Sequence, residues 1–311
     1  MTVTEGTPGA LVTERQLGGR FRLDERISLE EQLSGPCGPY LESAGVALWK
    51  ATDLLLERPV TIHTLPPGDV PGQVVEAVQA AARVSDARLA TIYDSDFHAA
   101  TPYIVSEWTP GTHLEDLVLS GLPSPALAAA MIADAADGIA TAHRAGLAHL
   151  GLTPHSLRWD DDRGLKITGL GIDASLCGTR VDDAVTADTR ALARMLYALL
   201  TGHWPGEQAT ALPAAPRYKG RVCTPRQVRA GVPAILDAIV YRGLAGQAPD
   251  APLRPQTPAG LALALHGIVR PSLQTARADE DAEYEALPAR RARHARSRHG
   301  GVVSSLLGQA A

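Results

Sequence analysis

The chain of 311 residues is poor in cysteine and in long apolar runs, and each shortage excludes a class of protein. Its three cysteines, Cys37, Cys177 and Cys223, lie far apart and form no CxxC pair. They indicate neither a disulfide framework nor a zinc site, as in proteins of a reducing cytoplasm. No stretch approaches the roughly 18 uninterrupted apolar residues of a membrane span. The first residues lack the basic start and apolar core of a signal peptide, so we expect a cytoplasmic protein.

Positive charge is also scarce. Lys and Arg total 29 against 34 Asp and Glu, a formal net charge of -5. A general nucleic-acid-binding protein usually has a basic face, so this balance argues against nucleic acid as a partner. Apolar residues at 45% and charged residues at 20% are ordinary for a globular protein, and the length suffices for one large two-lobed domain.

Strand-like patterns dominate the first third of the chain, after a leader of residues 1–18 that we expect to be flexible. Alternating apolar and polar residues predict five strands, and an Ala- and Val-rich stretch at 72–89 predicts a helix packed on the sheet. The predicted strands are 20–27, 45–53, 57–65, 89–97 and 101–111. Residues 19–108 are therefore predicted to form a small β-rich lobe.

From residue 109 to residue 270 the pattern is mainly helical. Long apolar-faced stretches that end near glycine or proline predict helices, and two short β-rich stretches flank a DDDRG turn. The predicted helices are 124–146, 186–202, 225–244 and 257–269, and the predicted strands are 156–160 and 165–169. Residues 271–311 combine an acidic block with a basic one, so we expect a disordered tail. Its basic block suits an anionic membrane surface or a juxtamembrane position.

This order of elements resembles the α+β, two-lobed fold of protein kinases. Residues 102–118 (PYIVSEWTPGTHLEDLV) are similar to the hinge and first C-lobe helix of bacterial Ser/Thr kinases. Residues 136–159 (ADGIATAHRAGLAHLGLTPHSLRW) are similar to the helix and catalytic loop, and residues 196–206 (LYALLTGHWPG) to the largest C-lobe helix and its turn. The resemblance covers about residues 19–270.

The resemblance implies positions for the residues of phosphoryl transfer, and this chain departs from the kinase pattern at each of them. Gly151 stands at the position of the catalytic Asp, and Gly169 at that of the metal-binding Asp of the DFG motif. Ser156 replaces the metal-binding Asn, and His63 replaces the strand lysine. A longer, acidic and proline-containing stretch at 28–47 replaces the glycine-rich loop.

Other kinase positions are implied as well. Arg158 falls on the floor of the nucleotide pocket, where kinases carry an apolar residue, and would fill or charge it; the alternative is a surface arginine. His149 and Asp188 are retained as structural residues that hold the catalytic loop. If a nucleotide binds, the implied hinge residues are Glu107, Trp108 and Thr109.

Three residues have alternative interpretations. Asp173 is predicted to cap the following segment, and its alternative role is metal ligand. The helix glutamate of kinases falls at Ala77, but Glu76 adjoins it, so a pair between His63 and Glu76 is the alternative to an unpaired cleft histidine. Lys50 is predicted to be a surface lysine, and its alternative position is the pocket.

Because all these positions are replaced together, we predict a pseudokinase: a non-enzymatic regulatory scaffold with no catalytic residue, metal or cofactor, in which ATP binding is disfavoured. The losses resemble those of the pseudokinase domains associated with the lipid II flippase of peptidoglycan synthesis. That resemblance implies a forkhead-associated-domain partner after phosphorylation of a tail threonine, here Thr275. The alternatives are a divergent Ser/Thr kinase with residual ATP binding or phosphotransfer, and a metal-independent nucleotide sensor.

Overall fold

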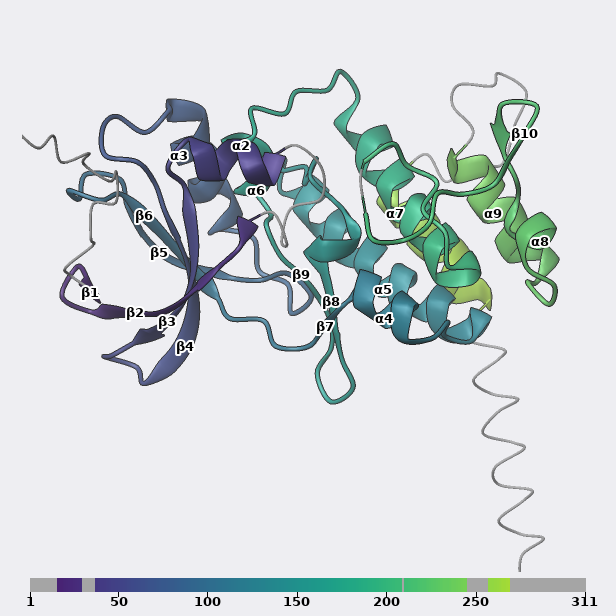
Figure 1. Cartoon of the computed structure of the whole chain (residues 1–311), viewed down its shortest axis with the longest axis horizontal. Coiled ribbons are helices and arrows are strands. Elements are labelled where there is room, and N and C mark those ends of the chain that lie inside the picture. The colour runs from purple at the N-terminus through teal and green to yellow at the C-terminus, as the bar shows by residue number, and fades with distance from the viewer. Residues whose placement is uncertain (1–15, 30–36, 209, 245–256, 269–311) are drawn as a thin grey trace, which may run out of the picture. The chain divides into compact units, whose positions relative to one another are not determined.

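The computed structural model describes residues 16–29, 37–208, 210–244 and 257–268. Most of them belong to one compact unit that runs to Leu265, and a second unit begins at His266. The first unit contains a β-rich lobe followed by a helical lobe, drawn from purple to blue and from teal to green in Figure 1. Over the described ranges, no helix is long and apolar enough to cross a membrane.

A six-stranded antiparallel sheet forms the β-rich lobe, in the strand order β1-β2-β3-β4-β6-β5. Its strands are β1 (Gln16–Leu17), β2 (Phe21–Ile27), β3 (Ala47–Asp53), β4 (Arg58–Thr64), β5 (Ile92–Asp96) and β6 (Tyr103–Glu107). Five of them lie where the alternating pattern predicts strands. The sixth, β1, was not predicted, because Gln16 and Leu17 fall in the predicted leader; they pair with Arg22 and Phe21 of β2.

The period-two pattern that predicts these strands also builds the core of the lobe. In β2, Phe21 and Leu23 are buried, whereas Arg22 and Asp24 face solvent, because successive side chains point to opposite faces of a sheet. The apolar face forms one cluster, which consists of Phe21, Leu23, Ala51, Val60, Ile62, Tyr103 and Val105. Burial of this face positions β4 and β6, whose residues also line the cleft between the two lobes.

Two helices, α2 (Cys37–Ser43) and α3 (Gly72–Ala81), accompany the sheet. The helix predicted at 72–89 ends earlier than predicted, because Asp86 forms a local turn instead: its Oδ1 accepts a hydrogen bond from the N–H of Arg88 at 2.9 Å. The helix α2 lies in the stretch that replaces the glycine-rich loop, and it was not predicted.

The helical lobe is built around two long helices, α5 (Pro125–Arg144) and α7 (Ala184–Thr201), which the sequence predicts. The N-cap side chain of Ser124 begins α5, and Gly202, with φ 76°, ends α7 in the left-handed conformation. Smaller elements complete the lobe: α4 (Leu114–Ser120), η1 (Pro154–Ser156), α6 (Asp173–Leu176), α8 (Pro225–Val228), α9 (Ala234–Leu244), and the hairpin of β10 (Arg217–Tyr218) and β11 (Arg221–Val222). Residues 258–268 are also helical.

The single helix predicted at 225–244 is wrong, because the chain forms α8 and α9 with a break between them. Gly231 adopts φ 86° and Pro233 has no N–H to donate, so a continuous helix cannot pass through both residues.

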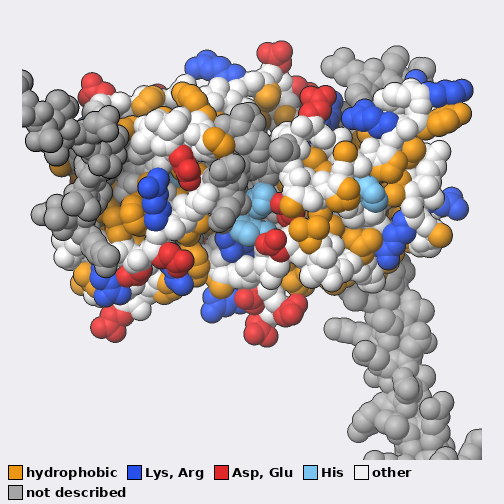
Figure 2. Space-filling view, in the orientation of Figure 1, with side chains coloured by type: hydrophobic (Ala, Val, Ile, Leu, Met, Phe, Trp, Pro, Cys, Tyr) orange, Lys and Arg blue, Asp and Glu red, His pale blue; other side chains and the backbone are white. Residues whose placement is uncertain are grey.

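A three-stranded sheet of β7 (Thr112–His113), β8 (Leu157–Asp160) and β9 (Gly164–Ile167) lies where the two lobes meet. The N–H of Ile167 donates to the carbonyl of Arg88 at 2.7 Å, and the N–H of Ala90 donates to the carbonyl of Ile167 at 2.8 Å. These bonds tie the C-lobe hairpin to the N-lobe. Figure 2 shows acidic side chains gathered at the tip of the hairpin, where the DDDRG turn faces solvent.

Asp53, at the end of β3, is a fully buried charge that joins two turns of the N-lobe. Its carboxylate binds Arg20 at 2.7 and 2.8 Å and accepts hydrogen bonds from the N–H groups of Leu55 and Leu56 at 3.2 and 3.3 Å. The hydrogen bond from Arg20 is the main reason that the pKa of Asp53 falls from 3.8 to about 2.

We expect Asp53→Asn to lower the free energy of unfolding by about 2 kcal/mol at pH 7. Because the folded-state pKa is depressed, the stabilisation is present above pH 4 and disappears as the pH falls towards 2, so the difference from wild type should shrink over that range. Urea unfolding at pH 7, 4 and 2.5 measures it. Asp24→Asn, which removes a solvent-exposed pair with Arg22, is the control and should cost less than about 1 kcal/mol; a pH-independent Asp53→Asn difference would contradict the assignment.

Candidate active site

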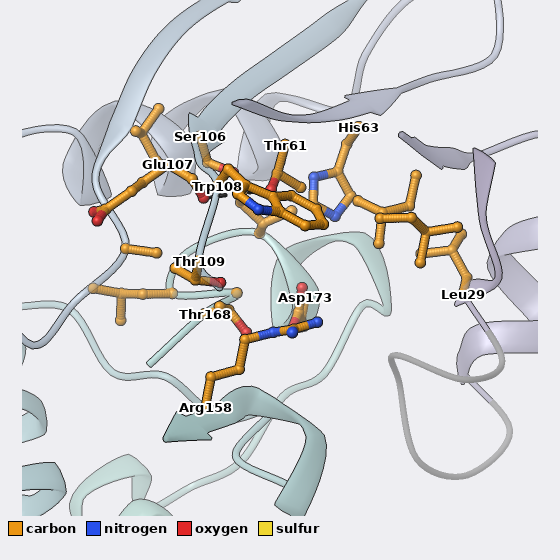
Figure 3. Close-up of a pocket in the computed structure, with 17 residues that line it drawn as sticks. Leu29, Thr61, His63, Ser106, Glu107, Trp108, Thr109, Arg158, Thr168 and Asp173 are labelled. Carbon is orange, nitrogen blue, oxygen red and sulfur yellow. Dashed lines mark hydrogen bonds between the residues drawn. The ribbon is translucent and has the colours of Figure 1, made fainter. Parts of the chain in front are cut away.

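The cleft between the lobes contains a narrow cavity of about 50 Å³ (Figure 3). Binding sites for drug-sized ligands usually enclose about 300–1,000 Å³, so the cleft is nearly closed in this conformation. Its lining comes from the N-lobe, the hinge and the C-lobe, and includes Leu29, Leu48, His63, Trp108, Thr109, Arg158, Thr168 and Asp173.

The catalytic-loop region is held by Asp188 of α7. Its carboxylate accepts hydrogen bonds from the N–H groups of His149 and Leu150, both at 2.8 Å, and lies 2.8 Å from Nε2 of His143. Leu150 adopts φ 59°, a left-handed conformation that is unfavourable for leucine. The two hydrogen bonds from consecutive N–H groups to Asp188 hold this conformation of the loop.

His149 joins the same loop to the end of β9. Its Nε2 lies 2.8 Å from the carbonyl of Thr168, and its Nδ1 accepts a hydrogen bond from the N–H of Gly151 at 3.3 Å. Since a carbonyl can only accept, Nε2 of His149 carries a proton. Gly151 is thereby placed beneath Asp173: a Cβ at position 151 would lie 3.4 Å from the Cβ of Asp173.

A carboxylate from elsewhere in the chain fills the place of the missing side chain at Gly169. Gly169 adopts φ 83°, and a Cβ built on it would run into the carboxylate of Asp173. Asp173 is the first residue of α6, and its N–H donates to the carbonyl of Gly169 at 3.1 Å. The turn at 169–173 therefore brings a buried carboxylate to the space that an aspartate at position 169 would occupy.

Burial raises the pKa of Asp173, although the nearby His149 opposes the shift. Only 7% of the residue is exposed, and its side chain lines the cleft (Figure 3). The N-cap of α6 is Ile172, and the carboxylate of Asp173 instead lines the cleft, so its alternative role as a metal ligand stays a prediction.

His63, on β4, does not reproduce the charge of a strand lysine. It is buried, and desolvation lowers its pKa to about 4, so the ring is neutral at pH 7. Among the described residues its Nδ1 has no hydrogen-bond partner, and no ion pair joins it to Glu76, which is exposed on α3. The alternative of a His63–Glu76 clamp is not found in this part of the chain.

Arg158 lies in the pocket and not on an open surface. Its side chain extends from β8 into the cleft (Figure 3), and its Nη1 donates to the carbonyl of Gly111 at 3.1 Å. Burial lowers its pKa, with Asp116 opposing the shift. Of the described residues that line this pocket, Arg158 is the one Lys or Arg.

The three implied hinge residues, Glu107, Trp108 and Thr109, line the cavity, and the side chain of Glu107 forms an ion pair. The Glu107 carboxylate binds Nζ of Lys166 at 2.7 Å and accepts from the N–H of Thr91 at 3.2 Å, which couples the hinge to β9 and β5. The Trp108 ring lines the cleft, and Nζ of Lys50 lies 5.0 Å from its centroid. Lys50 therefore lies over the hinge tryptophan.

Ser156 is occupied by local bonds. Its hydroxyl donates to the carbonyl of Thr153 at 2.8 Å and accepts from the N–H of Thr153 at 2.9 Å. Gly151 supplies no side chain, and Ser156 closes a turn, so Asp173 is the carboxylate that lines this cavity on the C-lobe side.

The structure also joins two cysteines that the sequence treats as separate. Cys37 of α2 and Cys177, the residue after α6, form a disulfide with a Cα–Cα distance of 5.9 Å, whereas Cys223 is free. The prediction of no disulfide is therefore wrong for this pair. The two cysteines lie 140 residues apart, so spacing along the chain carries no signal of their contact.

The predicted phosphoacceptor Thr275 and the basic tail lie outside the described residues. The forkhead-associated-domain partner and the membrane proximity that depend on them stay predictions.

No protein-family model matches the chain. Among curated proteins it is similar to the serine/threonine-protein kinase PknL of Mycobacterium tuberculosis H37Rv, with 28% identity over 65% of this chain and 59% of PknL. It is also similar to PknB of Mycolicibacterium smegmatis, with 26% identity over 56% of this chain and 36% of PknB, and to PrkC of Bacillus subtilis, with 23% identity over 64% and 35%. The chain thus spans less than two thirds of the length of each of these relatives.

Solved structures with the same fold include a point mutant of the kinase domain of Mycobacterium tuberculosis PknI, with a TM-score of 0.56 and 16% identity over 86% of this chain and 99% of that domain. Rad53 residues 1–466 in complex with AMP-PNP gives a TM-score of 0.52 and 19% identity over 71% of this chain and 60% of that one. The α+β, two-lobed protein-kinase fold is therefore confirmed.

Two predictions are wrong in the light of these relatives: that the chain is not an enzyme, and that it takes no cofactor, with ATP binding disfavoured. The relatives are named serine/threonine-protein kinases, and the Rad53 structure holds AMP-PNP. The physical reason for the error is the position of Asp173. Comparison position by position finds glycine at 169, whereas the cleft contains the carboxylate of Asp173, which is predicted from the sequence only as an alternative metal ligand.

We expect Asp173→Asn to stabilise the protein at neutral pH. Because burial raises the pKa of this carboxyl above its ordinary value of 3.8, the folded state holds the proton more tightly than the unfolded chain, and ionisation above about pH 4 costs stability. Removing the charge should raise the free energy of unfolding at pH 8 by on the order of 1–2 kcal/mol, and by less as the pH approaches 4.

Thermal unfolding of both proteins from pH 4 to pH 8 measures this difference. Asp162→Asn, in the solvent-exposed DDDRG turn, is the matched control and should unfold like the wild type throughout. A wild type that is more stable than Asp173→Asn at pH 8 would show that Asp173 is a structural residue and not a strained one.

Proposed function

We propose that the chain is a divergent Ser/Thr protein kinase that binds an adenine nucleotide with Mg²⁺ in the interlobe cleft. One observation carries the proposal: the carboxylate of Asp173 occupies the space of the side chain missing at Gly169. The kinase fold and the names of the relatives support it. The link to peptidoglycan synthesis stays part of this proposal and rests on the sequence resemblance alone.

The donor set of the cleft fits a magnesium ion. Mg²⁺ prefers oxygen ligands and is usually bound through one or two carboxylates together with substrate phosphates. Asp173 supplies one such carboxylate, buried and with its pKa raised, so that a cation would relieve the cost of its charge. When bound, the metal would neutralise charge on the phosphates.

The cation expected from a strand lysine comes, in this proposal, from Arg158. A neutral His63 cannot balance phosphate charge at pH 7, whereas the side chain of Arg158 lines the same cavity and carries a guanidinium. Arg pairs well with phosphate because its N–H groups match the geometry of two oxygens. Trp108 and Leu48 supply apolar surface for the base of the nucleotide.

Phosphotransfer is expected to be slow. Gly151 has no side chain with which to orient the attacking hydroxyl, and general bases typically contribute about 10²–10⁴-fold to rate. The nucleotide must also enter a cleft whose cavity is now about 50 Å³, so binding requires the lobes to open.

We expect calorimetric titration, in buffer with dithiothreitol, to detect ATP binding that Mg²⁺ strengthens. Asp173→Asn should weaken Mg²⁺–ATP binding at least tenfold and leave metal-free ATP binding unchanged, because only the metal ligand is lost. Asp162→Asn should bind like the wild type. Absence of any binding, or Mg²⁺ dependence that survives Asp173→Asn, would refute the proposal; transfer of labelled phosphate to a generic protein substrate tests the catalytic part.

A further inference from the structure

The Cys37–Cys177 disulfide joins α2 to the end of α6, and both helices are bonded to residues that line the cleft. Cys37 begins α2, in the stretch that replaces the glycine-rich loop, and Cys177 directly follows α6. Their Cα atoms lie 5.9 Å apart, within the usual range of a disulfide. The bond is therefore a covalent link between α2 and α6 in addition to the polypeptide of the hinge.

On the N-lobe side, α2 is coupled to the roof of the cavity. Oε1 of Glu42, in α2, accepts a hydrogen bond from the N–H of Leu29 at 2.7 Å. Leu29 is 1% exposed and lines the cavity. A displacement of α2 away from α6 would therefore act on Leu29 and open the roof.

On the C-lobe side, the disulfide lies one helical turn from Asp173. The N–H of Cys177 donates to the carbonyl of Asp173 at 2.9 Å, and the N–H of Leu176 donates to the carbonyl of Ile172 at 2.9 Å. Both Ile172 and Asp173 line the cavity. The same bond thus restrains the helix that carries the candidate metal ligand.

We propose that Cys37 and Cys177 form a reversible thiol–disulfide switch, and that the oxidised form holds the cleft closed against nucleotide. In this disulfide-linked structure the cavity measures about 50 Å³, too small for a nucleotide. Reduction removes the restraint between α2 and α6, so the roof and the Asp173 helix can separate. The nucleotide part of this inference rests on the proposed function, whereas the restraint does not.

The chemistry requires only a low-molecular-weight disulfide as oxidant. One cysteine thiolate attacks a sulfur of that disulfide, which forms a mixed disulfide and releases one thiol. The second thiolate then attacks the protein sulfur, which forms the Cys37–Cys177 bond and releases a second thiol. The two cysteine protons end on the two released thiols. Both cysteines are partly exposed, so small thiols and disulfides can reach them.

Three serine variants separate this switch from a general effect of oxidation. Cys37→Ser and Cys177→Ser each remove the bond. Cys223→Ser is the matched control, because Cys223 is free, and its described hydrogen bond to Tyr197 is made by its backbone carbonyl.

Each protein is treated with oxidised glutathione or with dithiothreitol, and peptides from a non-reduced digest are identified by mass spectrometry. The wild type and Cys223→Ser should yield the Cys37–Cys177 cross-linked peptide after oxidation and lose it after reduction. Their Mg²⁺–ATP affinity should fall at least tenfold on oxidation, whereas Cys37→Ser and Cys177→Ser should bind equally in both conditions. Hydrogen–deuterium exchange at Leu29 and at 172–177 should be slower in the oxidised wild type.

The outcomes distinguish this inference from the proposed function. Failure to form the cross-linked peptide, or equal ATP affinity of the oxidised and reduced wild type, overturns the switch. If no ATP binds in either condition, the proposed function fails, and the exchange measurement then decides the switch alone. Slower exchange on oxidation supports it, and equal exchange overturns it.

Discussion

The site depends on one constraint: the carboxyl group of Asp173 is buried in the space left by Gly169. Glycine is required at 169 both for its left-handed conformation and because any side chain would collide with this carboxylate. Burial disfavours the charge of this carboxyl group, so its ionisation lowers the stability of the folded state. A carboxyl group that is buried at a cost in stability is typical of a functional site. Its burial gives little structural benefit here, because α6, which begins at Asp173, is a helix of only four residues.

The rest of the site is held in shape by hydrogen bonds and close packing, although the charged residues of the kinase pattern are replaced at 63, 151 and 169. Asp188 binds consecutive N–H groups of the loop, and His149 ties Gly151 to the end of β9. Gly171, with φ 74°, allows α3 to approach closely, since a Cβ there would lie 2.7 Å from the carbonyl oxygen of Ala77. These contacts are structural and independent of nucleotide. They explain how a kinase fold persists although glycine, serine and histidine occupy positions of its chemistry.

The narrow cleft and the Cys37–Cys177 disulfide both involve the helix α2. The stretch that replaces the glycine-rich loop forms the helix α2, which is bonded to Leu29 through Glu42 and to the Asp173 helix through Cys177. A glycine-rich loop would cover phosphates with its own N–H groups, whereas here a helix and a disulfide restrain the entrance. In the proposed switch, binding of a nucleotide and opening of the cleft are coupled.

The sequence by itself determined the two-lobed fold, because strand alternation, helix periodicity and capping residues such as Ser124 and Gly202 act locally. It also predicted roles for Asp188 and the hinge residues, because each lies in a short segment that resembles a kinase segment. Only the tertiary structure decided the chemistry of the cleft. From the sequence, Asp173 is a metal ligand only as an alternative, and the turn at 169–173 decides that its carboxylate lines the cleft. The contact of Cys37 with Cys177 across 140 residues depends on how the chain returns on itself. The order of residues along the chain does not show which distant residues come into contact.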